Sequence, residues 1–484
     1  MAVDVFGTFN LLLSSFVVFQ IFALSAVQNV FNRYIPELIS NHEYHKLNRL
    51  LGGGFFFSLV LFTLLVGALY FYRDPFATFF NVENFHKYLL AFLVFNYAHF
   101  FHILSGVILK ALLLHKQAAL ITIFTSALKL GLYIYFFNEL DVNLLLYIES
   151  TIGIIFLLAG SYFYLKHLRS FDYSKTRTGI TPVTYKRVRR YGLLSMANEL
   201  GVGLVGKTSD YFIVAALSNP YQVGLFAFAH RIYGMVFKVL PFKDIQSVVR
   251  PLFFQKYSQQ YDIEEFQKIF AFMIKLLLPV YVFPALYFFF FGKSIISVVF
   301  DPRYLDAYWI TVIVLSSNFF LAFFFPLSLT AQLKERMDIL LYSKIVAVFS
   351  IFAGILGMKY FGVIGVAIAS VLGSFLKNAF IYYFMSKYKE VQYKFADYKR
   401  FLVIGLLLIP FLALHQIMLN AFLLIMLSIL FFAYALIIFF LFHPYTNFEL
   451  ALLKKISSKS TALHKTQQVV VLIYDKLSKF KFVS

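Results

Sequence analysis

The sequence contains no cysteine and few acidic residues. Without cysteine, the chain has no disulfide, no thiolate metal site and no cysteine nucleophile. Asp and Glu together number 23 against 43 Lys and Arg, so the formal net charge is +20. Charged residues of both signs make up only 14% of the 484 residues, against about a quarter in a typical soluble domain. These deficits argue against a soluble protein, and they raise the question of which anions balance the positive charge.

Apolar residues are abundant: they form 61% of the chain, and the mean hydropathy is +0.78. A soluble globule of this size has too little interior to bury so many apolar side chains, so a second apolar solvent is needed. The sequence therefore predicts an all-α polytopic membrane protein.

Thirteen apolar runs approach the length of about 20 residues that a helix needs to cross a bilayer. Several of the links between them contain only a few residues, which predicts antiparallel neighbours in a helical bundle. The predicted spans lie near residues 8–31, 50–72, 87–109, 117–138, 142–165, 191–217, 223–245, 269–299, 307–330, 338–359, 361–386, 400–418 and 420–442.

Basic and neutral loops alternate along the chain. The loop 166–190 contains eight Lys and Arg residues, and 387–400 contains five, whereas 138–141, 218–222 and 415–420 contain none. Under the positive-inside rule the basic loops face the cytoplasm. We therefore predict a multi-pass protein of the cell inner (cytoplasmic) membrane with a cytoplasmic C-terminus.

The sequence repeats itself at an offset near 220 residues. Val5-Phe-Gly-Thr-Phe opens one block and Val223-Gly-Leu-Phe opens the other. Arg33 follows Gly7 by 26 residues, and Arg250 follows Gly224 by 26 residues. Two lobes of six helices are expected, which is a common transporter plan with the site near the midplane. The span at 191–217 precedes the second block, whereas six residues precede Gly7, so the repeat predicts fourteen helices, the first of which is missing.

The repeat divides the chain into an N-lobe with a basic cytoplasmic linker (1–190), a C-lobe (191–398), two additional helices (399–452) and a basic cytoplasmic tail (453–484). The tail is mildly amphipathic near its end, so both a helix on the anionic inner leaflet and a solvated tail fit its composition.

Several motifs, in this order and spacing, carry a resemblance that covers nearly the whole chain. They are Val5-Phe-Gly-Thr-Phe with Arg33-Tyr-Ile-Pro-Glu37, Tyr191-Gly192, Asp210-Tyr-Phe-Ile-Val, Val223-Gly224 and Tyr360-Phe-Gly-Val-Ile-Gly365-Val-Ala-Ile-Ala369. The sequence resembles the multidrug/oligosaccharidyl-lipid/polysaccharide exporter superfamily, and within it the Wzx-like polysaccharide flippases. It departs from their pattern at Tyr211, where relatives often have a basic residue.

The resemblance implies a flippase rather than an enzyme. Such a protein moves a polyprenyl-pyrophosphate-linked oligosaccharide across the cytoplasmic membrane by alternating access of two lobes, for surface polysaccharide such as lipopolysaccharide O-antigen. The expected partners are this lipid-linked substrate, membrane lipids, a polysaccharide polymerase and glycosyltransferases, and no nucleic acid. We expect no cofactor beyond coupling to H⁺ or Na⁺.

Other chemistry is sparse in the sequence. No GxxxxGK[ST] motif is present, so this chain is not expected to hydrolyse ATP. His99 and His102 share a helix face, but they have no nearby acidic partner in the sequence, so we predict packing rather than a metal site.

Three acidic residues within the spans are candidates for ion coupling, because an ionisable group there costs about 2.5–3.5 kcal/mol on insertion scales and is rarely kept without a function. Glu199 and Asp210 share one helix face with Lys207. One interpretation is that the three residues form a stripe that lines a cavity. The other is that Lys207 and Asp210 neutralise each other as a local ion pair. Glu149 is either a partner for a lysine or a proton-coupling site.

Cations outnumber these acids within the spans. The set comprises Lys129, Lys207, Arg231, Lys275, Lys344 and Lys377. Such an excess favours an anionic substrate, because charge-assisted hydrogen bonds to phosphate are strong.

We assign five cations to a substrate-binding cavity: Lys129, Lys207, Arg231, Lys377 and Lys238, which shares a helix face with Arg231. Lys275 and Lys344 lie near the cytoplasmic ends of their spans, so snorkelling explains them equally well. An ion-coupled small-molecule antiporter of the multidrug type is the alternative on the same fold.

Overall fold

The computed structural model describes residues 2–82, 84–169, 184–204, 207–239, 262–334, 336–388, 391–442, 445–446 and 448–450. Within these residues the protein is helical and has no strand. Nine helices of the described part are long and apolar enough to cross a membrane. The predicted all-α polytopic membrane fold is confirmed.

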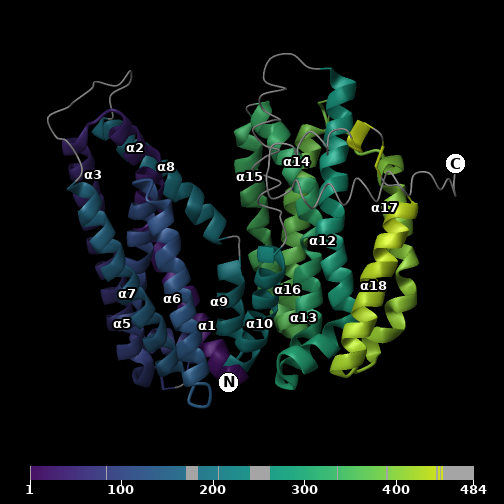
Figure 1. The fold of residues 1–484 in the computed structure, drawn as a ribbon, viewed down its shortest axis with the longest axis horizontal. Helices are drawn as coiled ribbons and strands as arrows, with labels where there is room; N and C mark the ends of the chain where they lie inside the picture. Colours follow the sequence, from purple (N-terminus) through teal and green to yellow (C-terminus); the bar gives the residue numbers. More distant parts are fainter. Residues whose placement is uncertain are drawn as a thin grey trace. The chain divides into compact units, whose positions relative to one another are not determined.

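The chain divides into two compact units, Met1–Ala227 and Phe228–Ser484. The first unit (purple to blue in Figure 1) is built from α1 (Val3–Ala23), α2 (Ser25–Ser40), α3 (Tyr44–Phe71), α4 (Arg73–Phe79), α5 (Phe85–Ala111), α6 (His115–Tyr135), α7 (Val142–Leu168), α8 (Tyr185–Leu204) and α9 (Lys207–Leu217). Helix α10 (Pro220–Val239) begins in this unit and continues into the second.

The second unit continues with α12 (Ile263–Val299), the 3-10 helix η1 (Pro302–Ala307), α13 (Tyr308–Ser316), α14 (Phe319–Leu333), α15 (Met337–Ala347), α16 (Phe349–Met385), α17 (Phe395–Leu407), the 3-10 helix η2 (Ile409–Gln416) and α18 (Ala421–Leu441). Its core lies along α12, where Phe266, Phe270 and Ile274 are completely buried.

Helix ends coincide with the short polar links in the sequence. Asp141 caps α7, and its carboxylate accepts a hydrogen bond from the backbone N–H of Leu144 at 2.7 Å. Asn219 accepts one from the N–H of Gln222 at 3.0 Å where α10 begins. Asp301 caps η1, and hydrogen bonds from Arg303 lower the pKa of Asp301 to about 2, so this cap stays charged at neutral pH.

Equivalent positions of the repeat contact each other inside the first unit. A Cβ atom added at Gly7 would lie 1.9 Å from the carbonyl oxygen of Pro220, and one added at Gly224 would lie 2.1 Å from that of Val3. Pro220 precedes Gly224 by four residues, as Val3 precedes Gly7. This exchange of equivalent partners is the signature of a local twofold relation, and it supports the repeat at the starts of α1 and α10.

Helices α8 and α9 pack against α1 and α2 within the first unit. The compact units thus divide the chain after Ala227, whereas the boundary predicted from the repeat lies between residues 190 and 191. The two divisions rest on different criteria, so the predicted lobes 1–190 and 191–398 stay a prediction. The tail at 453–484 lies outside the described residues.

The predicted spans map onto the observed helices with a few breaks. One apolar stretch, Asp338–Met385, contains two predicted spans. They separate at Gly362, whose φ of 61° interrupts α16. Three predicted spans have no counterpart among the nine spanning helices. The span at 191–217 corresponds to α8 followed by α9, the span at 223–245 to α10, and the span at 400–418 to α17 followed by η2.

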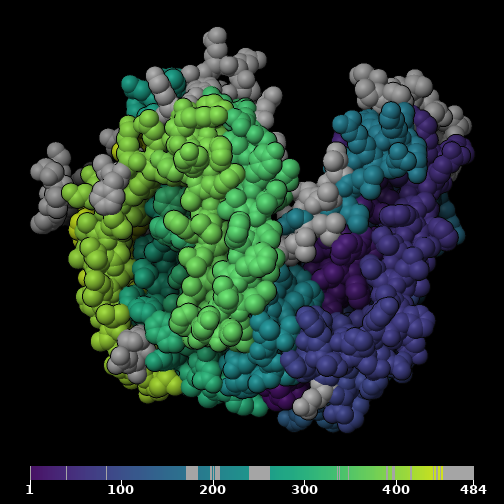
Figure 2. Space-filling model, turned by 180° about the vertical axis from the view of Figure 1, so that it is seen from behind, coloured from purple at the N-terminus to yellow at the C-terminus, as the bar shows by residue number. Residues whose placement is uncertain are grey.

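Large apolar side chains are exposed on α15 and α16 of the second unit. Figure 2 shows α15 and α16 as a broad green face. Exposed large side chains on these helices include Leu341, Ile345, Phe349, Phe352 and Leu356. Exposed apolar side chains of this size fit contact with lipid tails.

Candidate functional site

An ion pair joins Lys129 of α6 to Glu149 of α7 in the first unit. The side chains are 30% and 11% exposed. The hydroxyl of Tyr133, one turn from Lys129, donates to Glu149 Oε1 at 2.9 Å, and the Lys129 ammonium lies 5.6 Å from the centroid of the Tyr133 ring. Of the two interpretations of Glu149, the structure therefore supports the one in which Glu149 is the partner of a lysine. Lys129 has its charge balanced by that partner.

Three predicted cavity cations lie in the second unit without a carboxylate partner among the described residues. Arg231 and Lys238 are exposed on α10. Lys377 is partly buried on α16, and its ammonium lies 4.1 Å from the centroid of the Phe324 ring on α14. A cation over an aromatic face gains about 0.5–2 kcal/mol, but the ring supplies no counter-charge.

The predicted stripe on residues 191–217 falls on two helices. Glu199 is partly buried on α8, and Asp210 is buried on α9. Lys207 is the first residue of α9, but its side chain lies outside the described part. Whether Lys207 pairs with Asp210 or faces a cavity therefore stays a prediction.

Lys275 does not snorkel. Its ammonium donates to Glu449 Oε1 at 2.9 Å, and the two side chains are 7% and 5% exposed. Glu449 also accepts the backbone N–H of Thr446 at 2.7 Å, while Thr446 Oγ1 accepts that of Glu449 at 3.3 Å. This capping box ties the segment after α18 to α12. The carboxylate that neutralises Lys275 lies outside every predicted span, so counting charges within spans could not find it.

His99 and His102 pack among aromatic rings. The ring of His102 stacks on Phe156 with centroids 4.3 Å apart, and His99 meets Phe16 edge-on at 4.8 Å. Among the described residues, no group of three or more His, Cys, Asp and Glu could hold a metal ion. This geometry fits the predicted packing role.

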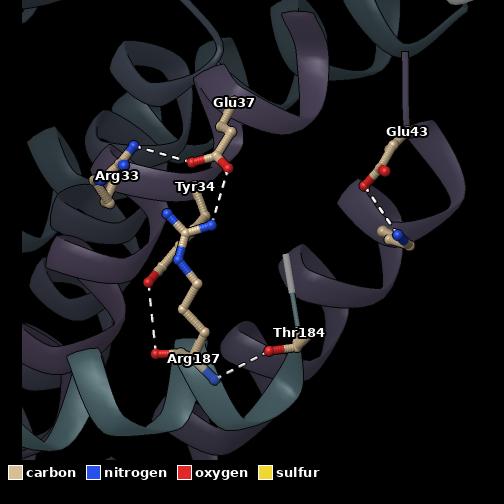
Figure 3. A network of polar contacts seen from close by, with 7 residues as sticks. Arg33, Tyr34, Glu37, Glu43, Thr184 and Arg187 are labelled. Carbon is tan, nitrogen blue, oxygen red and sulfur yellow. Dashed lines mark hydrogen bonds and ion pairs between the residues drawn. The ribbon is translucent and has the colours of Figure 1, made fainter. Parts of the chain in front are cut away.

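Figure 3 shows a network between α2 and α8 that our sequence analysis missed. Glu37 accepts from Arg33 at 3.0 Å and from Arg187 at 3.1 Å. The hydroxyl of Tyr34 donates to the backbone carbonyl of Arg187 at 3.5 Å, and Thr184 Oγ1 accepts the Arg187 N–H at 3.4 Å. The loop 166–190 had signalled only membrane orientation, because the charge of a loop does not reveal which helix it contacts.

No family model matches this sequence, and no curated protein matches it either. Solved structures share its fold, among them two transport proteins. One is an inward-facing multidrug resistance MATE family transporter of the MOP superfamily, with a TM-score of 0.59 and 15% identity, covering 78% of this chain and 90% of that chain. The other is the lipid II flippase MurJ in an inward closed conformation, with a TM-score of 0.59 and 15% identity, covering 90% of this chain and 98% of that chain.

These likenesses give the chain the fold of a transporter and of a flippase, and neither relative is an enzyme. They do not distinguish the Wzx-like branch from others on the same fold.

Proposed function

We propose that this chain is a flippase that moves a polyprenyl-pyrophosphate-linked oligosaccharide across the cytoplasmic membrane by alternating access of two lobes. The observation that carries the proposal is the set of second-unit cations without a described carboxylate partner, namely Arg231, Lys238 and Lys377. A membrane-embedded cation needs an anion, water or a headgroup, and a pyrophosphate supplies several strong acceptors. MurJ, a lipid II flippase, shares this fold.

In this proposal the cations bind the pyrophosphate or acidic sugars, and three acids couple transport to H⁺ or Na⁺. Glu149 would act through its pair with Lys129, because protonating the carboxylate frees the ammonium for an anion. Glu199 and Asp210 are the other two candidates. Surface polysaccharide biosynthesis, a cytoplasmic C-terminus, and a polymerase and glycosyltransferases as partners belong to the same proposal.

A deletion strain tests the proposal. We expect it to accumulate lipid-linked glycan and to lose surface polysaccharide, and we expect the intact gene to reverse both. Arg231→Ala and Lys377→Ala should each lower surface glycan about tenfold, the equivalent of one charge-assisted hydrogen bond to phosphate.

Lys268→Ala is the matched control, because Lys268 is an exposed lysine at the start of α12 in the same unit. Its surface glycan should stay at the level of the intact protein. Normal surface glycan in both site variants, at normal protein levels, would show that the cationic cavity is not the binding site.

The alternative is an ion-coupled small-molecule antiporter, because the MATE transporter matches this fold with the same TM-score as MurJ. The same deletion strain separates the two. An antiporter predicts increased sensitivity to cationic drugs and unchanged surface glycan.

A further inference from the structure

A second cationic site lies on the first unit, apart from the residues assigned to the substrate cavity. It is a pocket of about 420 Å³ next to the network of Figure 3. Its walls are Tyr34, Thr184, Lys186, Arg187, Arg190 and Tyr191.

The pocket is short of negative charge. It is lined by three cations, Lys186, Arg187 and Arg190, and its walls contain no carboxylate. Glu37 of the adjoining network pairs with Arg187 but also with Arg33. In the described part of the chain, neither Lys186 nor Arg190 has an ion pair, so the pocket keeps a positive charge that an anion can neutralise.

Arg187 is held in place before any ligand arrives. Its guanidinium lies 5.3 Å from the centroid of the Tyr34 ring, and Glu37 fixes one of its terminal nitrogens at 3.1 Å. Tyr191 meets Tyr34 edge-on at 5.7 Å. A guanidinium that is already ordered loses less conformational entropy when it binds, and its planar fork matches two phosphate oxygens.

We propose that this pocket binds a phosphate-bearing headgroup at the membrane surface. Two sources share this chemistry: the phosphodiester of an anionic bilayer lipid, and the pyrophosphate of a lipid-linked substrate. The pocket is formed by Tyr34 of α2 and by residues between Thr184 and Tyr191 at the start of α8. The charge pattern predicts that the start of α8 lies at the cytoplasmic face. The site goes beyond the proposed transport function. Binding of a bilayer lipid does not depend on that function, whereas binding of a substrate pyrophosphate rests on it.

Two arms of one experiment distinguish the sources. In the first, the full-length protein in phosphatidylcholine nanodiscs is titrated with radiolabelled inorganic pyrophosphate. In the second, retention of phosphatidylglycerol is measured by native mass spectrometry after extraction from mixed nanodiscs. We expect Lys186→Ala and Arg190→Ala each to weaken the binding of the anion that the pocket recognises, pyrophosphate or phosphatidylglycerol, about fivefold.

Arg189→Ala is the matched control, because Arg189 is an exposed cation on the same helix that does not line the pocket. It removes the same charge and should bind as the unaltered protein does. Arg190→Lys keeps the charge and should retain most of the affinity, which separates a lost contact from a misfolded helix.

Pyrophosphate binding that depends on Lys186 and Arg190 identifies the substrate headgroup, and phosphatidylglycerol retention with the same dependence identifies bulk lipid. Absence of binding in both arms overturns the proposal. The proposal is also overturned if Arg189→Ala loses as much affinity as Lys186→Ala and Arg190→Ala do. A positive result here combined with normal glycan in the Arg231 and Lys377 variants would remove the transport proposal alone.

Discussion

Charged side chains of the described helices differ in whether a carboxylate accompanies them. Lys129 and Lys275 each have one, Glu149 and Glu449 respectively. Lys377 instead lies over the ring of Phe324. A paired charge contributes to the architecture of its unit, whereas a cation without a carboxylate is available to a ligand. The charge excess of the sequence is therefore informative only after the paired residues are set aside.

The Lys275–Glu449 pair gives a stability prediction. Glu449→Gln leaves a buried ammonium without its counter-charge, so it should destabilise the protein by about 3–5 kcal/mol. The double substitution Lys275→Met with Glu449→Met should recover most of that loss, because no unpaired charge remains. Thermal unfolding of the purified full chain in detergent measures both. A single variant as stable as the unaltered protein would show that the pair is solvated.

At the scale of helices, close backbone contacts depend on glycine. The starts of α1 and α10 approach each other at Gly7 and Gly224, and no side chain fits between either glycine and the facing carbonyl. A second close contact joins Gly357 and Gly365 on the two arms of α16, on either side of the break at Gly362. The positive φ at Gly362 costs little only because glycine has no Cβ.

Alanine substitution separates these glycines from ordinary helix positions. Gly7→Ala and Gly224→Ala should each destabilise the protein by about 1–3 kcal/mol, because the helices must move apart to admit a methyl group. Gly67→Ala on α3 is the control, since nothing lies within 4 Å of its added Cβ. It should instead stabilise α3 by about 0.5–1 kcal/mol through helix propensity. The melting temperatures of the three variants test the contact between the starts of α1 and α10. Equal shifts in melting temperature for all three variants would show that this contact is absent.

Local features of these elements were readable from the sequence. Apolar length predicted most of the helices, and the predicted spans 338–359 and 361–386 meet close to Gly362, where α16 is interrupted. The pairings were not readable, because they join residues far apart in the chain. Glu37 and Arg187 are 150 positions apart, and Lys275 and Glu449 are 174 apart. The periodicity and composition of a single sequence indicate where helices form. No local pattern indicates which of the distant helices become neighbours.

For the whole molecule, long-range hydrogen bonds agree with the predicted sidedness of the loops. Four predicted spans separate the link 32–49, which contains Glu37, from the loop 166–190, which contains Arg187, so both are predicted to be cytoplasmic. The structure joins these two residues. Asn81 donates to the carbonyl of Ser218 at 2.8 Å, and both residues lie in segments predicted to be external. In the second unit, Ser294 Oγ, near the end of α12 that is predicted to be external, accepts the N–H of Leu419, which lies in a link also predicted to be external. Such contacts establish which loops share a face but not which face is cytoplasmic.

The absence of native cysteine allows a direct test of orientation, because a single introduced thiol is labelled without background. Asn138→Cys and Lys359→Cys lie at the predicted external ends of the spans 117–138 and 338–359, and Lys116→Cys and Lys387→Cys lie in predicted cytoplasmic links; all four positions are exposed. In intact spheroplasts, a membrane-impermeant maleimide should label the first two, and it should label the second two only after permeabilisation. The reverse pattern would invert the predicted orientation, and a mixed pattern would change the number of spans. Because the four positions sample four different links, an error in any one span would reverse the labelling of every site beyond it. The position at which the pattern first fails therefore confines the error to the spans between that site and the labelled site before it.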